Sequence, residues 1–234
     1  MGATIKVLGP VTSQTRITFS SRGEFRKIVS ERVEAYFRQH GLRSTGNWRM
    51  YIKTAIILIG LAASYAALVF FANSVLTAVV AAFFFAQGLI LVGLNIMHDG
   101  CHGSYSDNKL INKIMGFALD LIGGSNFVWR HKHNILHHTY TNVHGADEDL
   151  HTGGLLRLSP NQDKHRWHRY QHFYAFVLYS FLTLTWVTVV DLRRFFTRSI
   201  FNYRIPRVTV GDWVVLGAAK AIYFGYMIVV PSYF

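Results

Sequence analysis

The stretch TAIILIGLAASYAALVFFA at residues 54–72 has no charged side chain over 19 residues. A helix rises about 1.5 Å per residue, so this length spans the hydrocarbon core of a bilayer, which is roughly 30 Å thick. A second uncharged stretch of 23 residues, 75–97, follows directly after Asn73 and Ser74. So short a connection allows only an antiparallel pair. The sequence therefore predicts a transmembrane helical hairpin over residues 54–97.

The composition of the whole chain agrees with a membrane protein. Of its 234 residues 51% are hydrophobic and only 15% are charged, and the mean hydropathy is +0.22. These values are too apolar for an ordinary soluble domain, and 15% aromatic residues exclude a disordered chain. The single cysteine, Cys101, excludes an intramolecular disulfide framework and a zinc site built on several thiolates.

The charge of the chain is strongly positive. Lys and Arg total 24 against 12 Asp and Glu, which gives a formal net charge of +12. The cations lie in blocks between apolar stretches, as at the cytoplasmic flanks of membrane spans, and not on one contiguous face, so no nucleic-acid partner is expected. Ten of them precede residue 54 and the hairpin connection has none. We therefore expect residues 1–53 and both hairpin ends in the cytosol.

Two further apolar stretches decide the predicted domain organisation. If residues 173–190 crossed the membrane, the five arginines of residues 191–212 would face outside, against the positive-inside rule. We therefore expect 173–190 to lie at the interface or to re-enter. The predicted fold is an all-α membrane protein. Its cytosolic segment 1–53 contains an amphipathic helix between a capping box at Ser21–Glu24 and Gly41. The other predicted parts are the hairpin 54–97, a cytosolic histidine-rich region 98–172, the interfacial segment 173–190, an arginine-rich cytosolic segment 191–212, and a third span 213–234 that begins a second hairpin.

Every histidine except His40 lies between residues 98 and 172. His98 and His102 are four residues apart directly after the hairpin, so a helix would place both imidazoles on one face. His133 and His137 repeat this spacing, and His138 adds a neighbour turned by about 100°. Packing explains such a cluster poorly, because each buried ring nitrogen needs a partner. A metal site explains it better, and imidazole suits iron, zinc or copper.

The residues alone leave several metal chemistries open. A four-ligand zinc site would leave histidines unused, and HDGCH at 98–102 resembles the H-E-x-x-H motif of metalloproteases with Asp in place of Glu and Gly100 inside the helix. A carboxylate-type di-iron protein needs two E-x-x-H motifs, and the chain offers one candidate, Glu148–His151. A bis-histidine haem is disfavoured because the clusters lie at the membrane exit.

Three motifs together resemble a known family. HDGCH at 98–102, WRHKHNILHHTYTN at 129–142 and GADEDL at 145–150 are similar to the first two histidine boxes of the membrane fatty acid desaturases. The similarity extends to GNWRMYIKT at 46–54 and HRYQHFYAFVLYSFLTLTW at 168–186, and it is closest to the acyl-CoA, linoleoyl-CoA type. A third box of the form Q/H-x-x-H-H is absent from the chain, so we expect an incomplete and inactive fragment.

The resemblance implies a function and a set of metal ligands. The function is the O2-dependent desaturation of a fatty acyl chain, carried by CoA or by a lipid, at a non-haem centre of two iron ions at the cytosolic mouth of a four-span bundle. By motif match the ligands are His98, His102, His133, His137 and His138. A separate cytochrome b5 or ferredoxin-type protein would donate electrons. A membrane fatty acid hydroxylase and an inactive truncated product are the alternatives, and the bacterial inner membrane and the endoplasmic reticulum fit equally.

Other polar residues are assigned supporting roles. We expect six acceptors to hold ligand imidazoles by the second ring nitrogen, with surface capping as the alternative: Asp99, Asn134, Asn142, Asp147, Glu148 and Asp149. Seven cations are expected to meet CoA phosphates or lipid headgroups: Arg130, Lys132, Arg193, Arg194, Arg198, Arg204 and Arg207. Six histidines without a box position are expected in supporting or surface roles: His131, His144, His151, His165, His168 and His172.

Overall fold

The computed structural model describes residues 24–201 and 203–234, and the chain divides into two compact units, Met1–Ser44 and Thr45–Phe234. In the first unit, helix α1 (Glu24–Gln39) has no buried residue. Its salt bridges Lys27–Glu31 and Arg38–Glu34 each span one turn. The predicted helix is confirmed, whereas most of the predicted capping box lies outside the described residues.

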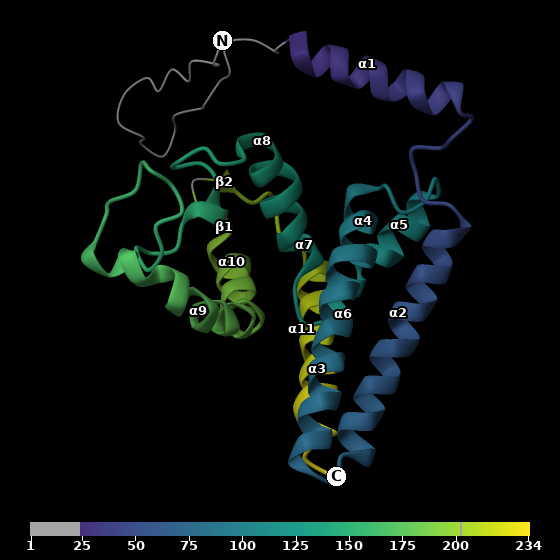
Figure 1. Ribbon diagram of the computed structural model, residues 1–234, viewed down its shortest axis with the longest axis vertical. Helices are drawn as coiled ribbons and strands as arrows, with labels where there is room; N and C mark the ends of the chain where they lie inside the picture. The colour runs from purple at the N-terminus through teal and green to yellow at the C-terminus, as the bar shows by residue number, and fades with distance from the viewer. Residues whose placement is uncertain (1–23, 202) are drawn as a thin grey trace. The chain divides into compact units, whose positions relative to one another are not determined.

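The second unit begins with the helical hairpin. Helix α2 (Trp48–Ala66) continues as the π-helical segment η1 (Ala67–Phe71), and α3 (Val75–Leu91) continues through the π-helical η2 (Val92–Met97) into α4 (His98–His102). The two arms run side by side (Figure 1). They are in tight contact at Gly88, where an added Cβ atom would lie 2.8 Å from Leu61 Cδ1. The predicted hairpin is thus present.

Short helices cover the end of the hairpin at which α4 lies. They are α5 (Lys109–Gly116), α6 (Ala118–Leu121), α7 (Asn126–Trp129), the π-helical η3 (Arg130–His137) and α8 (His138–Tyr140). Tyr105 is fully buried here and packs with Ile57, Val92 and Ile96. Its hydroxyl lies 2.6 Å from Thr54 Oγ1. This core fixes α4 relative to the first arm of the hairpin.

The remaining elements follow as a third group. They are the 3₁₀ helices η4 (Glu148–Leu150) and η5 (Arg166–Tyr170), α9 (Gln171–Thr185), the π-helical η6 (Trp186–Val190), α10 (Asp191–Thr197), the strands β1 (Ser199–Ile200) and β2 (Tyr203–Arg204), α11 (Val210–Phe224) and the π-helical η7 (Gly225–Val229). The strands pair antiparallel with Ser199 opposite Arg204. Val128, Leu136, Phe195 and Leu216 form one core cluster that joins this group to η3.

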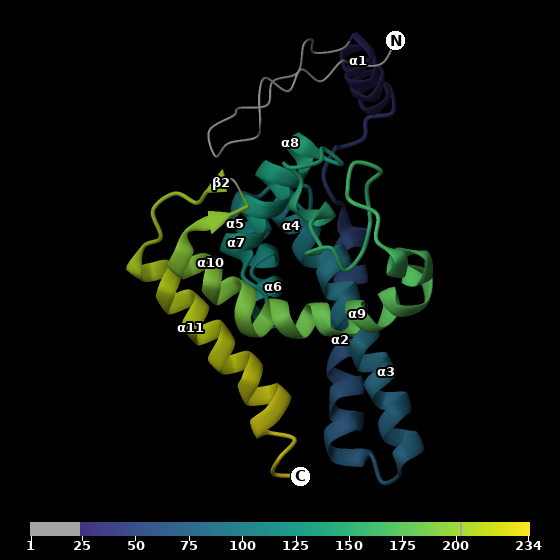
Figure 2. The same ribbon diagram turned by 90° about the vertical axis from the view of Figure 1, so that its left-hand side faces the viewer.

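The described residues contain four helical segments that are long and apolar enough to cross a membrane: Trp48–Phe71, Val75–His102, Arg166–Thr197 and Val210–Val229. The predicted all-α membrane fold is therefore confirmed. Figure 2 shows α9 at a large angle to α2, α3 and α11. The interfacial position of residues 173–190 stays a prediction, because length and composition also allow this segment to cross.

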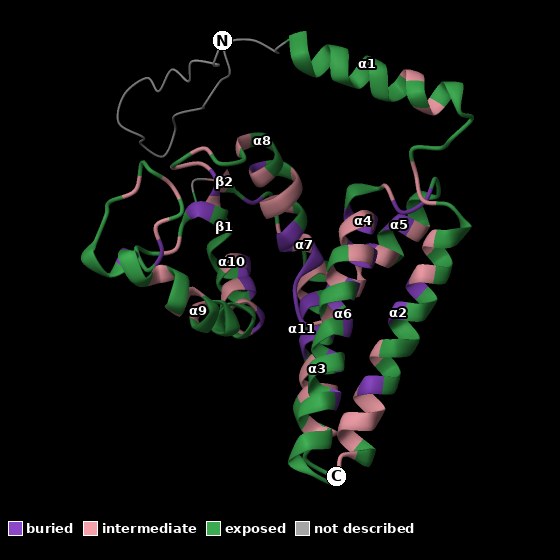
Figure 3. Cartoon of the chain, in the orientation of Figure 1, coloured by how far each residue is buried: buried purple, intermediate pink, exposed green. Residues whose placement is uncertain are grey.

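One buried lysine joins α11 to the rest of the unit. Lys220 Nζ donates to the carbonyl oxygens of Gly123 and Val187, both at 2.6 Å, and lies 3.3 Å from Asp191 Oδ2. Trp186 Nε1 donates to the other oxygen of Asp191 at 3.0 Å. A buried charge in an apolar helix requires such partners. Buried residues lie along α11 and α6, while much of α2 is exposed (Figure 3).

Candidate metal centre

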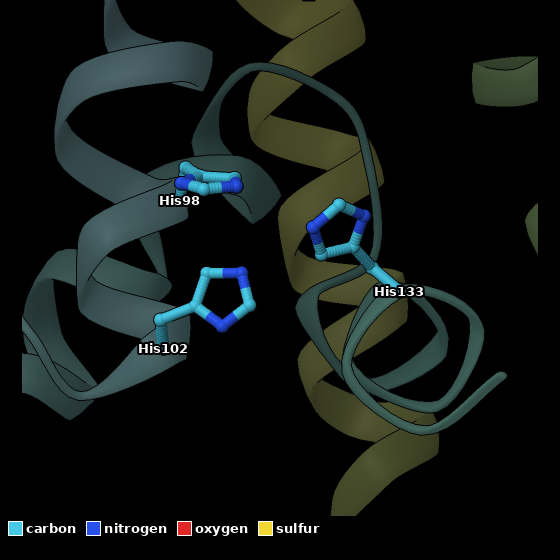
Figure 4. Close-up of side chains that lie close together, drawn as sticks. All are labelled: His98, His102 and His133. Carbon is cyan, nitrogen blue, oxygen red and sulfur yellow. The ribbon is translucent and has the colours of Figure 1, made fainter. Parts of the chain in front are cut away.

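Three predicted ligands face one another across two segments that are far apart in the sequence. His98 and His102 project from α4 towards His133 of η3 (Figure 4). One ring nitrogen of each lies within 4.8 Å of the others. The ring centroids of His98 and His102 are 4.5 Å apart, and each is 5.2 Å from that of His133. The structure therefore brings the two histidine boxes together.

The other two predicted ligands extend this cluster. His138 Nε2 lies 3.3 Å from His102 Nε2 and 3.2 Å from His133 Nε2. The ring of His137 stacks on that of His133, with centroids 5.3 Å apart. All five histidines thus form one connected cluster, which we call the histidine cluster.

The backbone of the second box differs from the simple expectation. An α-helix would place His133 and His137 on one face and turn His138 away. Instead η3 is π-helical, so its hydrogen bonds span five residues and the pair at i and i+5 comes together. This explains why the short contact joins His133 to His138. His137 turns towards Asp147 and Asp149, with Nδ1 3.2 Å from Asp147 Oδ1 and 3.1 Å from Asp149 Oδ2.

The electrostatics of the histidine cluster favour a neutral ring at His102 and His133, whose pKa values are lowered first by burial and then by neighbouring histidines. Burial, together with the neighbouring histidines, lowers the pKa of His133 to about 4. A neutral imidazole carries one proton and one nitrogen lone pair. Two nitrogen contacts meet at His138 Nε2, so the cluster gathers nitrogen atoms of three imidazoles in one region. Converging imidazole nitrogens are a donor set that fits iron or another first-row transition metal.

A buried carboxylate, that of Asp147, contacts His137 of the second histidine box. Asp147 is 3% exposed and accepts hydrogen bonds from the backbone N–H groups of Asn142 at 2.8 Å and Asp149 at 3.0 Å. Burial alone would raise the pKa of Asp147, but these hydrogen bonds and the contact with His137 hold it below its usual value. A carboxylate can only accept a hydrogen bond, so this contact favours the tautomer with the proton on His137 Nδ1 and the lone pair on Nε2, where a metal could bind.

The six predicted acceptors have different partners. Asp147 and Asp149 contact His137, and Asp99 Oδ1 lies 3.5 Å from His98 Nδ1. The others do not contact a ring of the histidine cluster by any hydrogen bond in the described part of the chain. Asn134 Nδ2 donates to the carbonyl oxygen of Cys101, Asn142 donates its backbone N–H to Asp147, and Glu148 accepts from Arg194 at 2.6 Å through both oxygens.

Two of the cations predicted to meet phosphates have partners within the protein. Arg194 pairs with Glu148, and Lys132 Nζ lies 2.6 Å from Asp149 Oδ1. Among the remaining histidines, His168 is buried with both ring nitrogens engaged, one by the N–H of His165 and one by the carbonyl oxygen of Gly154. That histidine has a structural role.

Trp129, the first residue of the motif at 129–142, had no predicted role but contacts three of the predicted ligands. Its ring stacks on His133, with centroids 4.2 Å apart and planes at 18°, and it meets His98 and His102 edge-on. It therefore limits the orientations open to three of the predicted ligands. Its position four residues before His133 on a helical segment was the available signal.

Comparisons with known proteins identify similar sequences. The sn-1 linoleoyl-lipid 6-desaturase of Arthrospira platensis is 35% identical over 223 residues, which are 94% of this chain and 60% of that protein. The enzyme of the same name from Synechocystis sp. is 34% identical over 92% of this chain and 60% of its own length. An acyl-lipid (8-3)-desaturase of Physcomitrium patens is 35% identical over 89% of this chain and 44% of its own length.

These relatives are longer than the chain, which spans about 60% of the first two. No solved structure matches it. Residues 74–234 match the profile of the family described as fatty acid desaturase. This range covers well over half of the chain and includes both parts of the histidine cluster. The chain therefore belongs to the fatty acid desaturase family.

Proposed function

We propose that this chain forms part of a membrane desaturase that introduces a double bond into a fatty acyl chain at a di-iron centre. The convergence of imidazole nitrogens from α4, η3 and α8 is the observation that supports this most directly. Bound iron would activate dioxygen, the oxidant needed to remove hydrogen from an unactivated methylene group. In this reaction the acyl chain loses two hydrogen atoms. An external donor supplies two electrons and solvent supplies two protons, so that dioxygen is reduced to two water molecules.

In this proposal His98, His102, His133, His137 and His138 are iron ligands. Five imidazoles are too few for two iron coordination spheres, so further ligands complete the centre. Asp147 fixes the tautomer of His137, and Trp129 fixes the plane of the His133 ring. The hydrogen bond from Asn134 to the Cys101 carbonyl holds the second box against the first.

The names of the relatives bear on the substrate carrier. All three name lipid-linked acyl chains and none names a CoA thioester. We therefore favour an acyl chain carried by a membrane lipid over the linoleoyl-CoA-like substrate. A separate cytochrome b5 or ferredoxin-type protein would supply the electrons. The positive flank before α2 favours a site facing the cytosol, in a bacterial inner membrane or the endoplasmic reticulum.

The test is expression of the complete reading frame that contains this chain, in a host fed with linoleate. Gas chromatography of the host fatty acids should show a new polyunsaturated product, found in the lipid fraction and not the CoA fraction. His138→Ala should abolish this product and lower the iron content of the purified protein. His172→Ala is the matched control, since its ring contacts Phe173 outside the histidine cluster, and it should retain both.

Each alternative has its own outcome. Hydroxylated fatty acids in place of polyunsaturated ones would identify a hydroxylase. Full activity and iron content in His138→Ala would contradict the ligand assignment. A host whose lipids do not change, although the protein is present and loaded with iron, would contradict the enzymatic proposal itself.

A further inference from the structure

A groove opens on the membrane hairpin outside the histidine cluster. Its volume is about 390 Å³, within the range of sites that bind small molecules. One wall is formed by α2, and the other by one turn at the junction of α3 and η2. The residues that line it are Arg49, Ile52, Lys53, Ile56, Ile57, Leu91 and Asn95.

The two helices leave this space because their tight contact lies elsewhere. Gly88 packs against Leu61, about two turns further along α2 than the lysine of the groove. On the side of that contact nearer Trp48, the side chains of Ile52, Ile56 and Leu91 are 49%, 66% and 42% exposed. The groove is therefore an apolar channel on the outer face of the hairpin.

One end of this channel is cationic. Arg49 and Lys53 lie one helical turn apart, and neither forms an ion pair with a carboxylate in the described part of the chain. Lys53 Nζ donates to Asn95 Oδ1 at 3.2 Å, and the Arg49 guanidinium carbon lies 5.6 Å from the ring centroid of Trp48. Like charges at this spacing repel each other, and the repulsion grows as the surroundings become less polar. A bound anion would remove it.

The position along the helix identifies the kind of anion. Trp48 begins the first candidate span, and tryptophan concentrates where a span meets the headgroup region. The cations therefore lie at headgroup depth, while Ile56 and Leu91 lie deeper among the acyl chains. A molecule that fits both parts has an apolar chain and an anionic head. Arg and Lys both donate charge-assisted hydrogen bonds to phosphate oxygens.

We propose that the groove binds one anionic phospholipid of the surrounding bilayer. Its phosphate lies between Arg49 and Lys53, and one of its acyl chains lies along Ile52, Ile56 and Leu91. Asn95 keeps the Lys53 ammonium group at the mouth of the groove. The site is separate from the five histidines, so this inference does not depend on the proposed desaturation.

The test is native mass spectrometry of the purified full chain, titrated with phosphatidylglycerol and, separately, with phosphatidylcholine. Phosphatidylglycerol should bind more tightly, because its headgroup has a net negative charge. Arg49→Gln/Lys53→Gln should bind it about thirtyfold more weakly, as expected for the loss of two cations at the membrane surface. Inorganic phosphate at millimolar concentration should not displace the lipid.

Two further variants distinguish lipid binding in the groove from a general electrostatic attraction between anionic lipid and the positively charged chain. Arg166→Gln/Arg169→Gln removes the same charge at the start of another candidate span, where Arg169 also lies over an aromatic neighbour, Tyr170. It should leave lipid affinity unchanged. Ile56→Trp fills the channel and keeps both cations, so it should weaken binding and provides an independent test if the double variant folds poorly.

Three results would overturn the proposal. The first is phosphatidylglycerol affinity in Arg49→Gln/Lys53→Gln equal to that of the wild type. The second is an equal loss in Arg166→Gln/Arg169→Gln, which would show a diffuse attraction by the net positive chain. The third is complete displacement of the lipid by inorganic phosphate, which would show an anion site without a role for the channel. All three are measured without turnover.

Discussion

Two aspartates of this protein have pKa shifts in opposite directions although the solvent-exposed fraction of each is small. Asp147, in the turn after α8, is 3% exposed, and Asp120, on α6, is 5% exposed. Asp147 accepts two backbone N–H groups and contacts His137. Asp120 accepts one N–H, from Asn126 at 3.3 Å, and its Oδ2 has no partner among the described residues. Burial raises the pKa of Asp120 to about 7.

The difference follows from depth and donors together: Asp120 is packed more deeply in the protein and accepts fewer hydrogen bonds, so its carboxyl group keeps its proton to a higher pH. The turn from Asn142 to Asp149 directs N–H groups at Asp147, so a full negative charge stands behind the second histidine box. The segment around Asp120 supplies too few donors, so the folded protein retains a proton there at mildly acidic pH. Only the first arrangement can hold an imidazole in a fixed tautomer.

The largest expected effect concerns the pH dependence of stability. The unfolded chain releases the Asp120 proton near its ordinary pKa of 3.8, while the folded chain keeps it until about pH 7. The folded state therefore binds more protons between these values, and this group lowers stability progressively as pH rises through them. The loss is at most about 4 kcal/mol for three pKa units.

Asp120→Asn isolates this contribution. The thermal denaturation midpoints of the purified wild type and variant, measured between about pH 4 and pH 8, should differ increasingly in favour of the variant as pH rises. A difference that stays constant over this range would show that Asp120 is already ionised in the folded protein, and the contrast with Asp147 would disappear.

The second effect concerns metal affinity. Asp147→Asn retains the shape of the side chain but removes the charge behind His137, so iron affinity should fall about 10- to 100-fold. The iron content of the purified protein measures this directly. Asp149→Asn is the control, because that side chain is 42% exposed and contributes less to the position of His137. An equal or larger loss in Asp149→Asn would reverse the roles given to the two carboxylates.

A smaller effect is expected at the ion pair between Arg194 and Glu148, which anchors the turn from Asn142 to Asp149. Arg194→Lys keeps the charge but loses the direct 2.6 Å contacts of the guanidinium nitrogen with both oxygens of Glu148. We expect a loss of about 1–2 kcal/mol in unfolding free energy and a partial loss of iron. Arg193→Lys changes the exposed neighbouring residue in the same way and should have no effect. Equal midpoints for both variants would show that the ion pair does not hold the turn.

The smallest effect tests the backbone that supplies a donor to Asp147. Asn142 has a φ of 61°, in the left-handed region. Asn142→Ala should lower stability by about 1 kcal/mol, whereas Asn142→Gly should stay within about 0.5 kcal/mol of the wild type. Thermal denaturation of the three proteins in parallel provides the comparison. A larger loss for glycine than for alanine would assign the role of Asn142 to its side chain.

The parts of the fold that the sequence predicts are those set by local pattern. Two uncharged stretches separated by Asn73 and Ser74 determine the hairpin, because length and hydropathy suffice. The spacing of His98 and His102 survives in the structure because α4 is α-helical. For His133, His137 and His138 the sequence does not predict that η3 is π-helical, which adds a contact between His133 and His138 to the stacking of His137 on His133.

The parts that the sequence does not predict depend on contacts between distant residues. Glu148 and Asp147 are neighbours in a run of acids, yet one meets Arg194 and the other His137. Which carboxylate faces which group follows from the path of the turn and not from composition. Likewise, Lys220 interrupts an apolar stretch, and its partners Gly123 and Val187 come from other parts of the chain.

The Lys220 contacts also impose an order on biogenesis. The ribosome makes the histidine boxes first, and Asp191 has no buried cation beside it until Lys220 has been synthesised and α11 has packed. Asp191 begins α10, and α10 also carries Arg194, which holds the turn behind His137. Packing of α11, which is synthesised after both histidine boxes, thus adds to the support of the turn behind His137, because Lys220 and Arg194 both act through α10.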